Sequence, residues 1–223
     1  MENTAMENTR TKTTRNSLIL LLTAAIWGMA FVSQSKGMDY MHPFTFNGVR
    51  SLIGAASILV YILISRKIAG DKAAPLDWKL NVKAGLLCGI FLTIASTLQQ
   101  FGIKYTSVGK AGFITTLYII FVPMFGIFLK KKVAPVVWVA AVMAAVGMYL
   151  LCMTESLRLG AGDIMVFLCA IAFAIQIMTV DHYAARIDGA VVSCIQFTVC
   201  GVVCCIGALI WGQPTFGQLQ EGL

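Results

Sequence analysis

Seven apolar runs, each about as long as a membrane-spanning helix, take up most of this 223-residue chain. A helix needs roughly 17 to 25 apolar residues to cross the hydrocarbon core of a bilayer. The predicted spans are Ser17–Ser35, Phe44–Ser65, Ala84–Ile103, Ala111–Leu129, Val136–Met153, Gly162–Val180 and Ala190–Trp211. Because short breaks join most of them, consecutive helices are expected to be antiparallel neighbours. The sequence therefore predicts an all-α polytopic membrane protein.

The composition agrees with a lipid environment. Hydrophobic residues make up 58% and charged residues 12% of the chain, whereas soluble domains are about half apolar and a quarter charged. The net charge of +7 comes from lysines and arginines that lie between the apolar runs, so nucleic-acid binding is not expected. All seven cysteines fall inside apolar runs without a CxxC pair. They are predicted to be packing residues, with no metal site and no cofactor.

The distribution of basic residues predicts the orientation of the chain. A cytoplasmic N-terminus places 12 of the 17 basic residues in the cytoplasm and leaves Lys36, Arg50, Lys104, Lys110 and Arg158 on the other side. The positive-inside rule favours this arrangement. Residues 1–16 are then a polar cytoplasmic tail, predicted to be disordered because it is too hydrophilic to bury, and residues 212–223 are extracytoplasmic.

A weak internal repeat appears when the chain is shifted against itself by 146 positions. The shift aligns AAIWGMAFV at 24–32 with AIAFAIQIM at 170–178, so that Trp27 falls on Phe173 and Arg50 on Gln196. Five spans separate the two copies, which therefore enter the membrane from opposite sides. An inverted-topology repeat of this kind is typical of secondary transporters.

Three stretches of the chain resemble the EamA-type transporters of the drug/metabolite transporter superfamily. They are AAIWGMAFVSQSKGMDYMHPFTFNGVRSLIGA, LQQFGIKYTSVGKAGFITTLYIIFVPMFGIFL, and GAGDIMVFLCAIAFAIQIM followed by DHYAARIDGAVVSCIQF. The resemblance implies ten helices in two inverted five-helix repeats around a central cavity. It also implies movement of small metabolites across the inner membrane.

On this resemblance, residues 17–153 form the first five-helix repeat and residues 162–211 the first two helices of the second. Seven of the expected ten helices are present, and we expect the sequence to be truncated after the seventh. Lys130–Lys132 stand where many family members carry a glutamate after the fourth helix. No role of that glutamate transfers to this chain.

Polar side chains inside the spans indicate where a solute would bind, because such groups are costly in lipid and tend to face a bundle interior or cavity. Gln99 and Gln176 fall on helices that the resemblance places around the cavity, and either contact substrate or bond neighbouring helices. Trp27 and Phe31, one turn apart, either stack on a solute or pack in the core. The predicted cavity residues are Trp27, Phe31, Gln99, Tyr118 and Gln176.

Three further features concern helix geometry and charge. Arg50 lies seven residues into its span, where it acts either as an anchor that reaches the interface or as part of a gate. Pro123 is predicted to bend its helix, either as a fixed kink or as a hinge. Gly85 and Gly89 form a GxxxG pattern, which favours packing within the chain over a homodimer or a partner half.

The sequence thus predicts a secondary transporter of small organic metabolites, such as amino acids or related compounds, that works by alternating access without covalent chemistry. The alternative is a half-transporter or adaptor that pairs with a partner carrying the missing helices. A GxGD protease is also suggested by Gly160–Asp163, but it needs a second carboxylate. A seven-helix receptor would require the opposite orientation.

Overall fold

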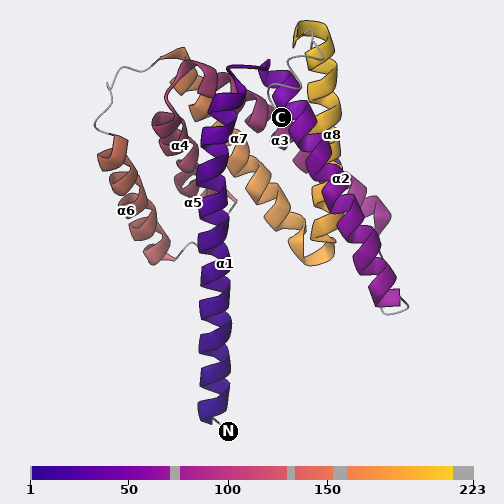
Figure 1. Ribbon diagram of the computed structural model, residues 1–223. Coiled ribbons are helices and arrows are strands. Elements are labelled where there is room, and N and C mark those ends of the chain that lie inside the picture. Colours follow the sequence, from indigo (N-terminus) through magenta and orange to yellow (C-terminus); the bar gives the residue numbers. More distant parts are fainter. Residues whose placement is uncertain (1, 71–75, 130–133, 153–159, 213–223) are drawn as a thin grey trace.

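The computed structural model describes residues 2–70, 76–129, 134–152 and 160–212 (Figure 1). The helices are α1 (Glu2–Gly37), α2 (Pro43–Ala69), α3 (Trp78–Tyr105), α4 (Val108–Thr116), α5 (Tyr118–Phe128), α6 (Pro135–Cys152), α7 (Ala161–Tyr183) and α8 (Gly189–Gly207). A short 3₁₀ helix, η2 (Ala184–Arg186), follows α7, and a π-helical turn, η3 (Ala208–Gly212), follows α8.

Each predicted span falls on helical residues. The fourth covers α4 and α5, the seventh continues from α8 into η3, and Met153 at the end of the fifth lies outside the described residues. Six helical segments of the described residues are long and apolar enough to cross a membrane. The helices α4 and α5 together make one of these segments, Val108–Phe128, while α6 is a shorter apolar helix. The chain is therefore an all-α polytopic membrane protein, as the sequence predicted.

The prediction of a disordered N-terminal tail is wrong, because α1 begins at Glu2 and continues without a break to Gly37. Once an apolar helix has formed, each further residue adds a backbone hydrogen bond without a new nucleation cost. Several residues of this segment, among them Glu, Ala, Met, Arg and Lys, are good helix formers. The polar segment therefore extends the helix although its residues cannot be buried in a core.

The interruption in the fourth span does not lie at Pro123, where the sequence predicted a bend. Pro123 sits inside α5, and the break between α4 and α5 falls at Leu117. There the N–H of Leu117 bonds the carbonyl of Ile114 at 3.2 Å, and the N–H of Ile120 bonds the carbonyl of Leu117 at 2.9 Å. These i to i+3 bonds tighten the chain into a 3₁₀-like turn, so the distortion is six residues upstream of the proline.

Side-chain caps fix the starts of α2, α3, α4 and α8. Asp77 accepts the N–H of Leu80 at 3.0 Å at the start of α3, and Asp188 accepts the N–H of Ala190 at 3.0 Å at the start of α8. Ser107 does the same for α4. Such caps satisfy backbone donors that have no partner within the helix.

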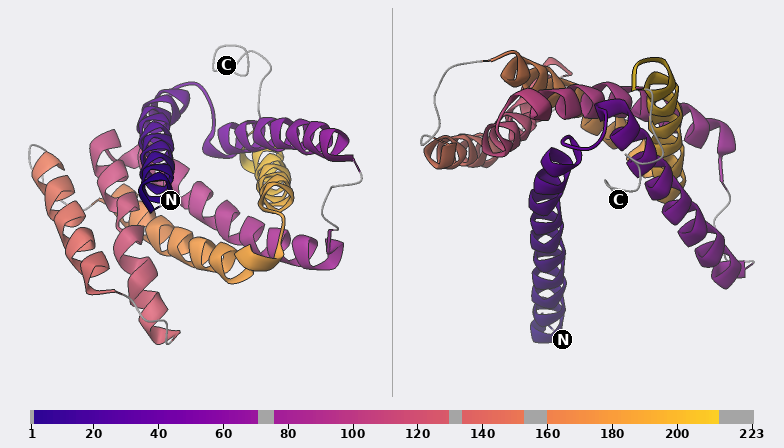
Figure 2. Two further views of the ribbon diagram at one scale, coloured as in Figure 1. Left: turned by 90° about the horizontal axis from the view of Figure 1, so that it is seen from below. Right: turned by 45° about the horizontal axis from the view of Figure 1, so that its top comes forward.

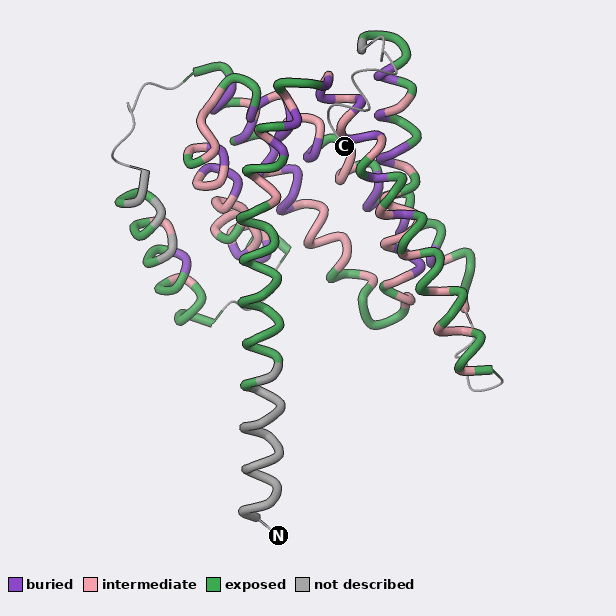
Figure 3. Tube along the Cα trace, in the orientation of Figure 1, coloured by how far each residue is buried: buried purple, intermediate pink, exposed green. Residues whose placement is uncertain are grey.

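The helix α3 forms the centre of the bundle. It packs along α7 and α8, and α2 covers the other side of α8. The views in Figures 1 and 2 show α1 standing away from this group and α6 at the margin opposite to α2 and α8. Buried residues accordingly concentrate on α3, α7 and α8 and on the first half of α2, whereas most of α1 from residue 16 onward is exposed (Figure 3).

The helices α2 and α8 run antiparallel in close contact. Residues near the start of α2 meet the end of α8, since a Cβ added at Gly207 would lie 3.0 Å from the ring of Phe44. A Cβ at Gly48 would lie 2.8 Å from the sulfur of Cys205. At the other end of the pair, Arg66 lies 3.6 Å from Asp188. Small residues let the two backbones approach, as is common between membrane helices.

The ends of the helices reproduce the repeat seen in the sequence. The helix α1 ends at Gly37 and α7 at Tyr183, while α2 begins at Pro43 and α8 at Gly189. Both pairs of positions are 146 residues apart, the same offset that aligns the sequence with itself. Because α2 and α8 are equivalent and antiparallel, their arrangement is the one that an inverted repeat requires.

Candidate functional site

We call the two ends of the bundle the His42 end and the Asp188 end, after the residues that precede α2 and α8. The helices α2 and α7 run from the His42 end to the Asp188 end, and α3 and α8 run in the opposite direction. This follows from the antiparallel contacts of α2 with α8 and of α3 with α7, where Gly102 near the end of α3 meets Gly162 near the start of α7.

Polar residues concentrate on α3 in a segment of about two helical turns, residues 93–100, which we call the α3 polar segment. Its polar members are Thr93, Ser96, Thr97, Gln99 and Gln100. Ser96, Gln99 and Gln100 are buried although the surrounding helices are apolar. Buried polar groups in membrane helices mark helix contacts or a solute path.

The two glutamines of the α3 polar segment bond different helices. Gln99 donates from Nε2 to the hydroxyl of Thr115 on α4 at 3.3 Å. Gln100 donates from Nε2 to the backbone carbonyl of Gln34 on α1 at 3.2 Å. Both bonds are buried, so they hold α1 and α4 against the central helix.

Ser96 connects the α3 polar segment to α2 and α8. Its carbonyl accepts the Nδ2 of Asn47 at 3.0 Å, and its hydroxyl lies 3.4 Å from the sulfur of Cys200. The hydroxyl of Ser51 on α2 reaches the same sulfur at 3.4 Å. The polar residues of the α3 polar segment therefore bond residues of four helices, α1, α2, α4 and α8.

Three buried oxygens near the His42 end have no hydrogen-bond partner in the described part of the chain. They are Oε1 of Gln34, Oε1 of Gln100 and Oγ1 of Thr45. Leaving a buried acceptor unpaired costs about 1–3 kcal/mol. These positions favour a group that donates hydrogen bonds, such as an N–H of a bound solute or a water molecule.

Arg50 is held beside this region by two residues of its own helix. Its Nη2 donates to Oδ1 of Asn47 at 2.9 Å, and its guanidinium lies 5.4 Å from the centre of the Phe46 ring. Asn47 is fully buried, whereas Arg50 is exposed. The guanidinium thus has a fixed position with part of its surface open.

Three of the predicted cavity residues lie around α3 and α4. Gln99 bonds Thr115, and Tyr118, one turn further, packs against a cluster of Ala95, Cys169, Ala172 and Phe173. Phe31 packs against a second cluster, of Ile103, Ala111, Ile114 and Val166. Trp27 has half of its surface exposed, one turn from Phe31.

Gln176 lies apart from this group. It donates from Nε2 to Oε1 of Gln196 on α8 at 3.0 Å. The helices α3 and α7 are antiparallel, and Ala95 of α3 clusters with Cys169, Ala172 and Phe173 of α7. Gln99 follows Ala95 toward the His42 end, whereas Gln176 follows Phe173 toward the Asp188 end. At 1.5 Å per residue they are separated by at least about 10 Å along the helix axes. The structure therefore does not bring these two glutamines together.

A cavity with a volume of about 470 Å³ lies between α3, α5 and α7. Its lining is mostly apolar and includes Leu87, Phe125, Met178 and Tyr183. None of the predicted cavity residues contributes to it, and Pro123 does not line it either.

The glycines of the GxxxG pattern are occupied within the chain. A Cβ added at Gly85 would lie 2.7 Å from Ile195, and one at Gly89 would lie 2.8 Å from Val199. Both partners belong to α8. This confirms the preference for intramolecular packing and corrects the suggestion of a homodimer or partner half through these glycines, because α8 already covers their face.

A buried ion pair joins α4 to the start of α7. Lys110 Nζ lies 3.3 Å from Oδ2 of Asp163, which is only 3% exposed. The same carboxylate accepts the hydroxyl of Thr106 and, at 2.9 Å, the N–H of Gly160. None of these partners is an acid, so the structure gives no support to the protease alternative.

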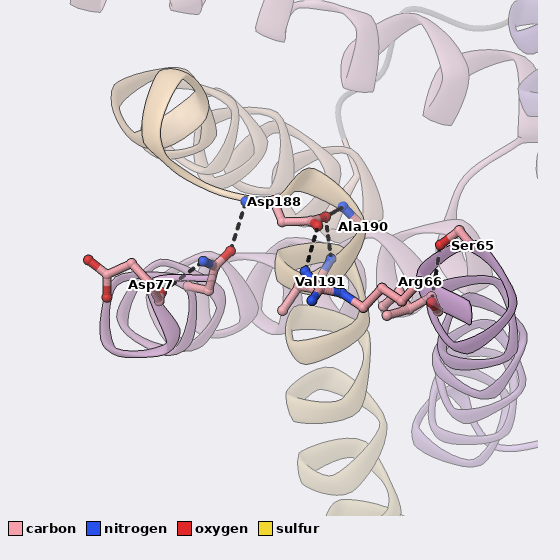
Figure 4. A network of polar contacts seen from close by, with 8 residues as sticks. Ser65, Arg66, Asp77, Asp188, Ala190 and Val191 are labelled. Atoms are coloured by element: carbon pink, nitrogen blue, oxygen red, sulfur yellow. Dashed lines mark hydrogen bonds and ion pairs between the residues drawn. The ribbon is translucent and has the colours of Figure 1, made fainter. Parts of the chain in front are cut away.

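A second polar network lies at the Asp188 end (Figure 4). Asp188 pairs with Arg66 of α2 at 3.6 Å, and its N–H donates to Oδ1 of Asn81 on α3 at 2.9 Å. Asn81 in turn donates to the carbonyl of Asp77 at 2.8 Å. The network therefore ties α2, α3 and α8 together at this end.

No group of three or more His, Cys, Asp or Glu residues within the described ranges could hold a metal ion.

Some residues of the site were not predicted from the sequence. Asn47 is a polar residue in a span, and its spacing of three from Arg50, which places both on one helix face, is a signal that could have linked the two. Ser96 and Thr115 resemble ordinary small polar residues of membrane helices. The pairing of Lys110 with Asp163 joins residues 53 positions apart, and no local pattern indicates it.

The fold and its buried polar residues define a polytopic helical membrane protein whose spans contact one another through a polar central helix. The EamA-like transporter family model matches residues 15–153, which is more than half of the chain. The chain therefore belongs to the EamA-like transporter family.

Comparison with other proteins gives one named relative. The chain is 31% identical over 166 residues to a protein of Archaeoglobus fulgidus named "Uncharacterized transporter". The matched region covers 74% of this chain and 48% of the relative, so the chain spans about half the length of the curated relative it matches. No solved structure matches the chain.

Proposed function

We propose that the protein is part of a secondary transporter that moves small organic metabolites, such as amino acids or related compounds, across the inner membrane by alternating access. The observation that carries the proposal is the α3 polar segment, residues 93–100, buried in an otherwise apolar bundle. Membership of the EamA-like family supports it. Polar groups at such depth are expensive unless they bond neighbouring helices or a solute.

The proposed solute path passes between α1, α3, α4 and the start of α5, the helices that carry the predicted residues Phe31, Gln99 and Tyr118. The unpaired oxygens of Gln34 and Gln100 add two buried acceptors beside it. A solute that carries an ammonium or amide group would supply the donors that these oxygens lack. The role of Gln176 is proposed to be separate, as a bond between α7 and α8.

The test is an efflux and uptake screen on cells that express the protein. Cells are challenged with toxic amino-acid analogues and, separately, loaded with a mixture of labelled amino acids and related metabolites. The proposal expects a change in resistance and in the flux of at least one compound, relative to cells with the empty vector. Unchanged flux across the whole panel, with the protein shown to be in the membrane, would contradict it.

The orientation is a separate part of the proposal, with the N-terminus in the cytoplasm and the His42 end outside. It rests on the 12 basic residues that this arrangement places in the cytoplasm. An alkaline phosphatase reporter fused before Met1 is expected to be inactive. Activity of that fusion would reverse the orientation.

A second candidate function is a subunit that pairs with a polypeptide carrying further helices. One observation favours it, namely that no residue is buried in the most apolar 18-residue stretch of α1. Purification in mild detergent followed by native mass measurement separates the two. Bound polypeptide in a fixed ratio supports a subunit, and protein that transports without one supports the first proposal.

A further inference from the structure

Arg50 carries a charge in a membrane span that has no acid to balance it. The span Pro43–Ala69 contains no aspartate or glutamate, and the guanidinium bonds the neutral amide of Asn47. The ion pairs of the described residues join Lys110 to Asp163 and Arg66 to Asp188. A charged side chain at such depth is costly and requires a partner, which makes it a candidate site.

The guanidinium is also held in a defined position. Asn47, with none of its surface exposed, is fixed by its bond to the carbonyl of Ser96 at 3.0 Å. Its other amide atom, Oδ1, receives one N–H of Arg50, and the ring of Phe46 lies beside the guanidinium. A guanidinium has five N–H donors in a planar fork. One bond to Asn47 leaves a side of that fork able to bind two oxygens of a single group.

The location connects this fork to the proposed solute path. Through Asn47, Arg50 is tied to Ser96, and Gln99 follows Ser96 by one helical turn on the same helix. A group bound at Arg50 therefore lies next to the α3 polar segment. Arg50 is seven residues from the start of α2, about 10 Å at 1.5 Å per residue, so it is reached from the His42 end.

In the second copy of the repeat, the position that corresponds to Arg50 carries an uncharged residue. Gln196 corresponds to Arg50 at the offset of 146 residues, and its amide oxygen is bonded by Gln176 at 3.0 Å. The amide oxygen at that position is therefore bonded within the protein. The equivalent position in α2 instead presents a cation with open donors, and this difference between the copies points to a ligand at Arg50.

We propose that Arg50 binds the carboxylate of the transported solute, with Asn47 as the positioning residue. The solute class is then a carboxylic acid such as an amino acid or a small organic acid. The inference rests on the proposed transport function. Planar forks of this kind favour carboxylate and phosphate through paired, charge-assisted hydrogen bonds. The phosphate of a lipid headgroup offers the same chemistry, and the experiment separates the two sources.

The experiment measures uptake by the purified full chain in phosphatidylcholine vesicles, with a mixture of ¹⁴C-labelled amino acids as the probe. Unlabelled amino acids and their methyl esters are added as competitors. In the wild type, acids are expected to compete at least about tenfold better than esters, the ratio that 1.4 kcal/mol of interaction produces. Arg50→Gln is expected to lose this preference and raise KM, and Arg50→Lys to retain part of it. Arg66→Gln is the control, since Arg66 lies on the same helix as Arg50 but already pairs with Asp188, which precedes α8.

The outcomes separate the two levels of the proposal. Wild-type uptake that prefers acids, lost in Arg50→Gln, supports the carboxylate site. Equal preference in the wild type and Arg50→Gln overturns the site while leaving transport intact. Arg50→Gln could instead lower the uptake of acids and esters alike, by an amount that changes when phosphatidylglycerol is added. That result assigns Arg50 to lipid phosphate and also overturns the carboxylate site. No wild-type uptake above empty vesicles overturns both the site and the transport function. Thermal unfolding of each variant in detergent confirms that it is folded.

Discussion

The helices α1 and α7 occupy the same place in the two copies of the repeat, yet only α7 is packed into the bundle. Within the most apolar 18-residue stretch of each helix, 39% of the residues of α7 are buried and none of those of α1. Both stretches are apolar enough to cross a membrane. The difference therefore comes from their neighbours, because α7 lies along α3 while α1 touches α3 and α4 mainly near its end, through Phe31 and Gln34.

The same comparison holds for individual residues. Phe173 of α7 is 9% exposed and belongs to a cluster with Ala95, while Trp27, at the equivalent position of α1, is 50% exposed. An apolar sequence is thus enough to place a helix in the membrane but does not decide how much of it contacts protein. Substitutions at equivalent positions test this directly.

The largest expected effect is at the aromatic pair. Phe173→Ala removes a buried ring and leaves a cavity, so we expect it to lower the free energy of unfolding by about 3 kcal/mol. Trp27→Ala should change it by less than about 1 kcal/mol because the side chain is half exposed. Unfolding of the purified protein in mixed micelles, followed by circular dichroism, measures both. Similar losses in the two variants would break the comparison.

The next effect concerns the start of α7. Asp163→Asn removes the charge that Lys110 and Thr106 bond, and hydrogen bonds to charged groups are worth about 1.5–3 kcal/mol. We expect a loss of about 2 kcal/mol in the same unfolding assay. Ser17→Asn, at the equivalent and exposed position of α1, is the matched control and should be neutral. The double variant Asp163→Asn with Lys110→Met should be less destabilised than Asp163→Asn alone, since it also removes the lysine charge that faces the carboxylate.

A smaller effect is expected at the glycine that brings α3 and α7 together. A Cβ at Gly102 would meet Val166 and would lie 2.9 Å from the backbone carbonyl of Gly162. Gly102→Ala should therefore cost about 1–2 kcal/mol, as overpacking does. Gly28 on α1 has nothing within 4 Å of such a Cβ, and Gly28→Ala should leave the protein equally or more stable. A loss at Gly28 as large as that at Gly102 would show that α1 is packed.

The smallest expected change in the free energy of unfolding concerns the N-terminal caps of α2 and α8, the second helix of each repeat copy. Nδ1 of His42 accepts the N–H of Phe44 at the start of α2, whereas a carboxylate, Asp188, caps α8. Burial and the nearby charge of Lys104 lower the pKa of His42 below its usual value of 6.5. The unfolded chain therefore takes up this proton first, and folding stability falls as the pH drops through the range below 6.5.

We expect the loss at His42 to amount to a few tenths of a kcal/mol, as for a weakened helix cap. His42→Asn keeps a side-chain acceptor without the titration and should flatten the pH dependence of unfolding between about pH 7 and about pH 5. His182→Asn is the control for removing an exposed histidine. If His42→Asn retained the full pH dependence, the assignment to this cap would be wrong.

The positions of the helices could be predicted from the sequence because each apolar run is long enough to span a bilayer and the breaks are short. The repeat was also visible, since its offset of 146 residues recurs in the helix ends. The bend at Leu117 could not be predicted, because the proline that signals a distortion lies elsewhere in the helix.

The site was predicted only in part, for a physical reason. Hydropathy indicates which polar residues are buried, and it selected Gln99 correctly as a buried residue of a central helix. It does not show the depth at which two helices meet, so Gln176 was grouped with Gln99 although it bonds Gln196. The partners of Arg50 and Asp163 depend on helix contacts between distant parts of the chain, which a single sequence does not display.

The central claim is that the α3 polar segment serves transport through Gln99. The most direct test is the initial uptake rate of an identified substrate into vesicles that contain wild-type protein or Gln99→Ala, with Gln176→Ala alongside. We expect a large fall in uptake for Gln99→Ala, a smaller one for Gln176→Ala, and normal folding of both. Unchanged uptake in Gln99→Ala, and in the double variant with Gln176→Ala, would contradict it.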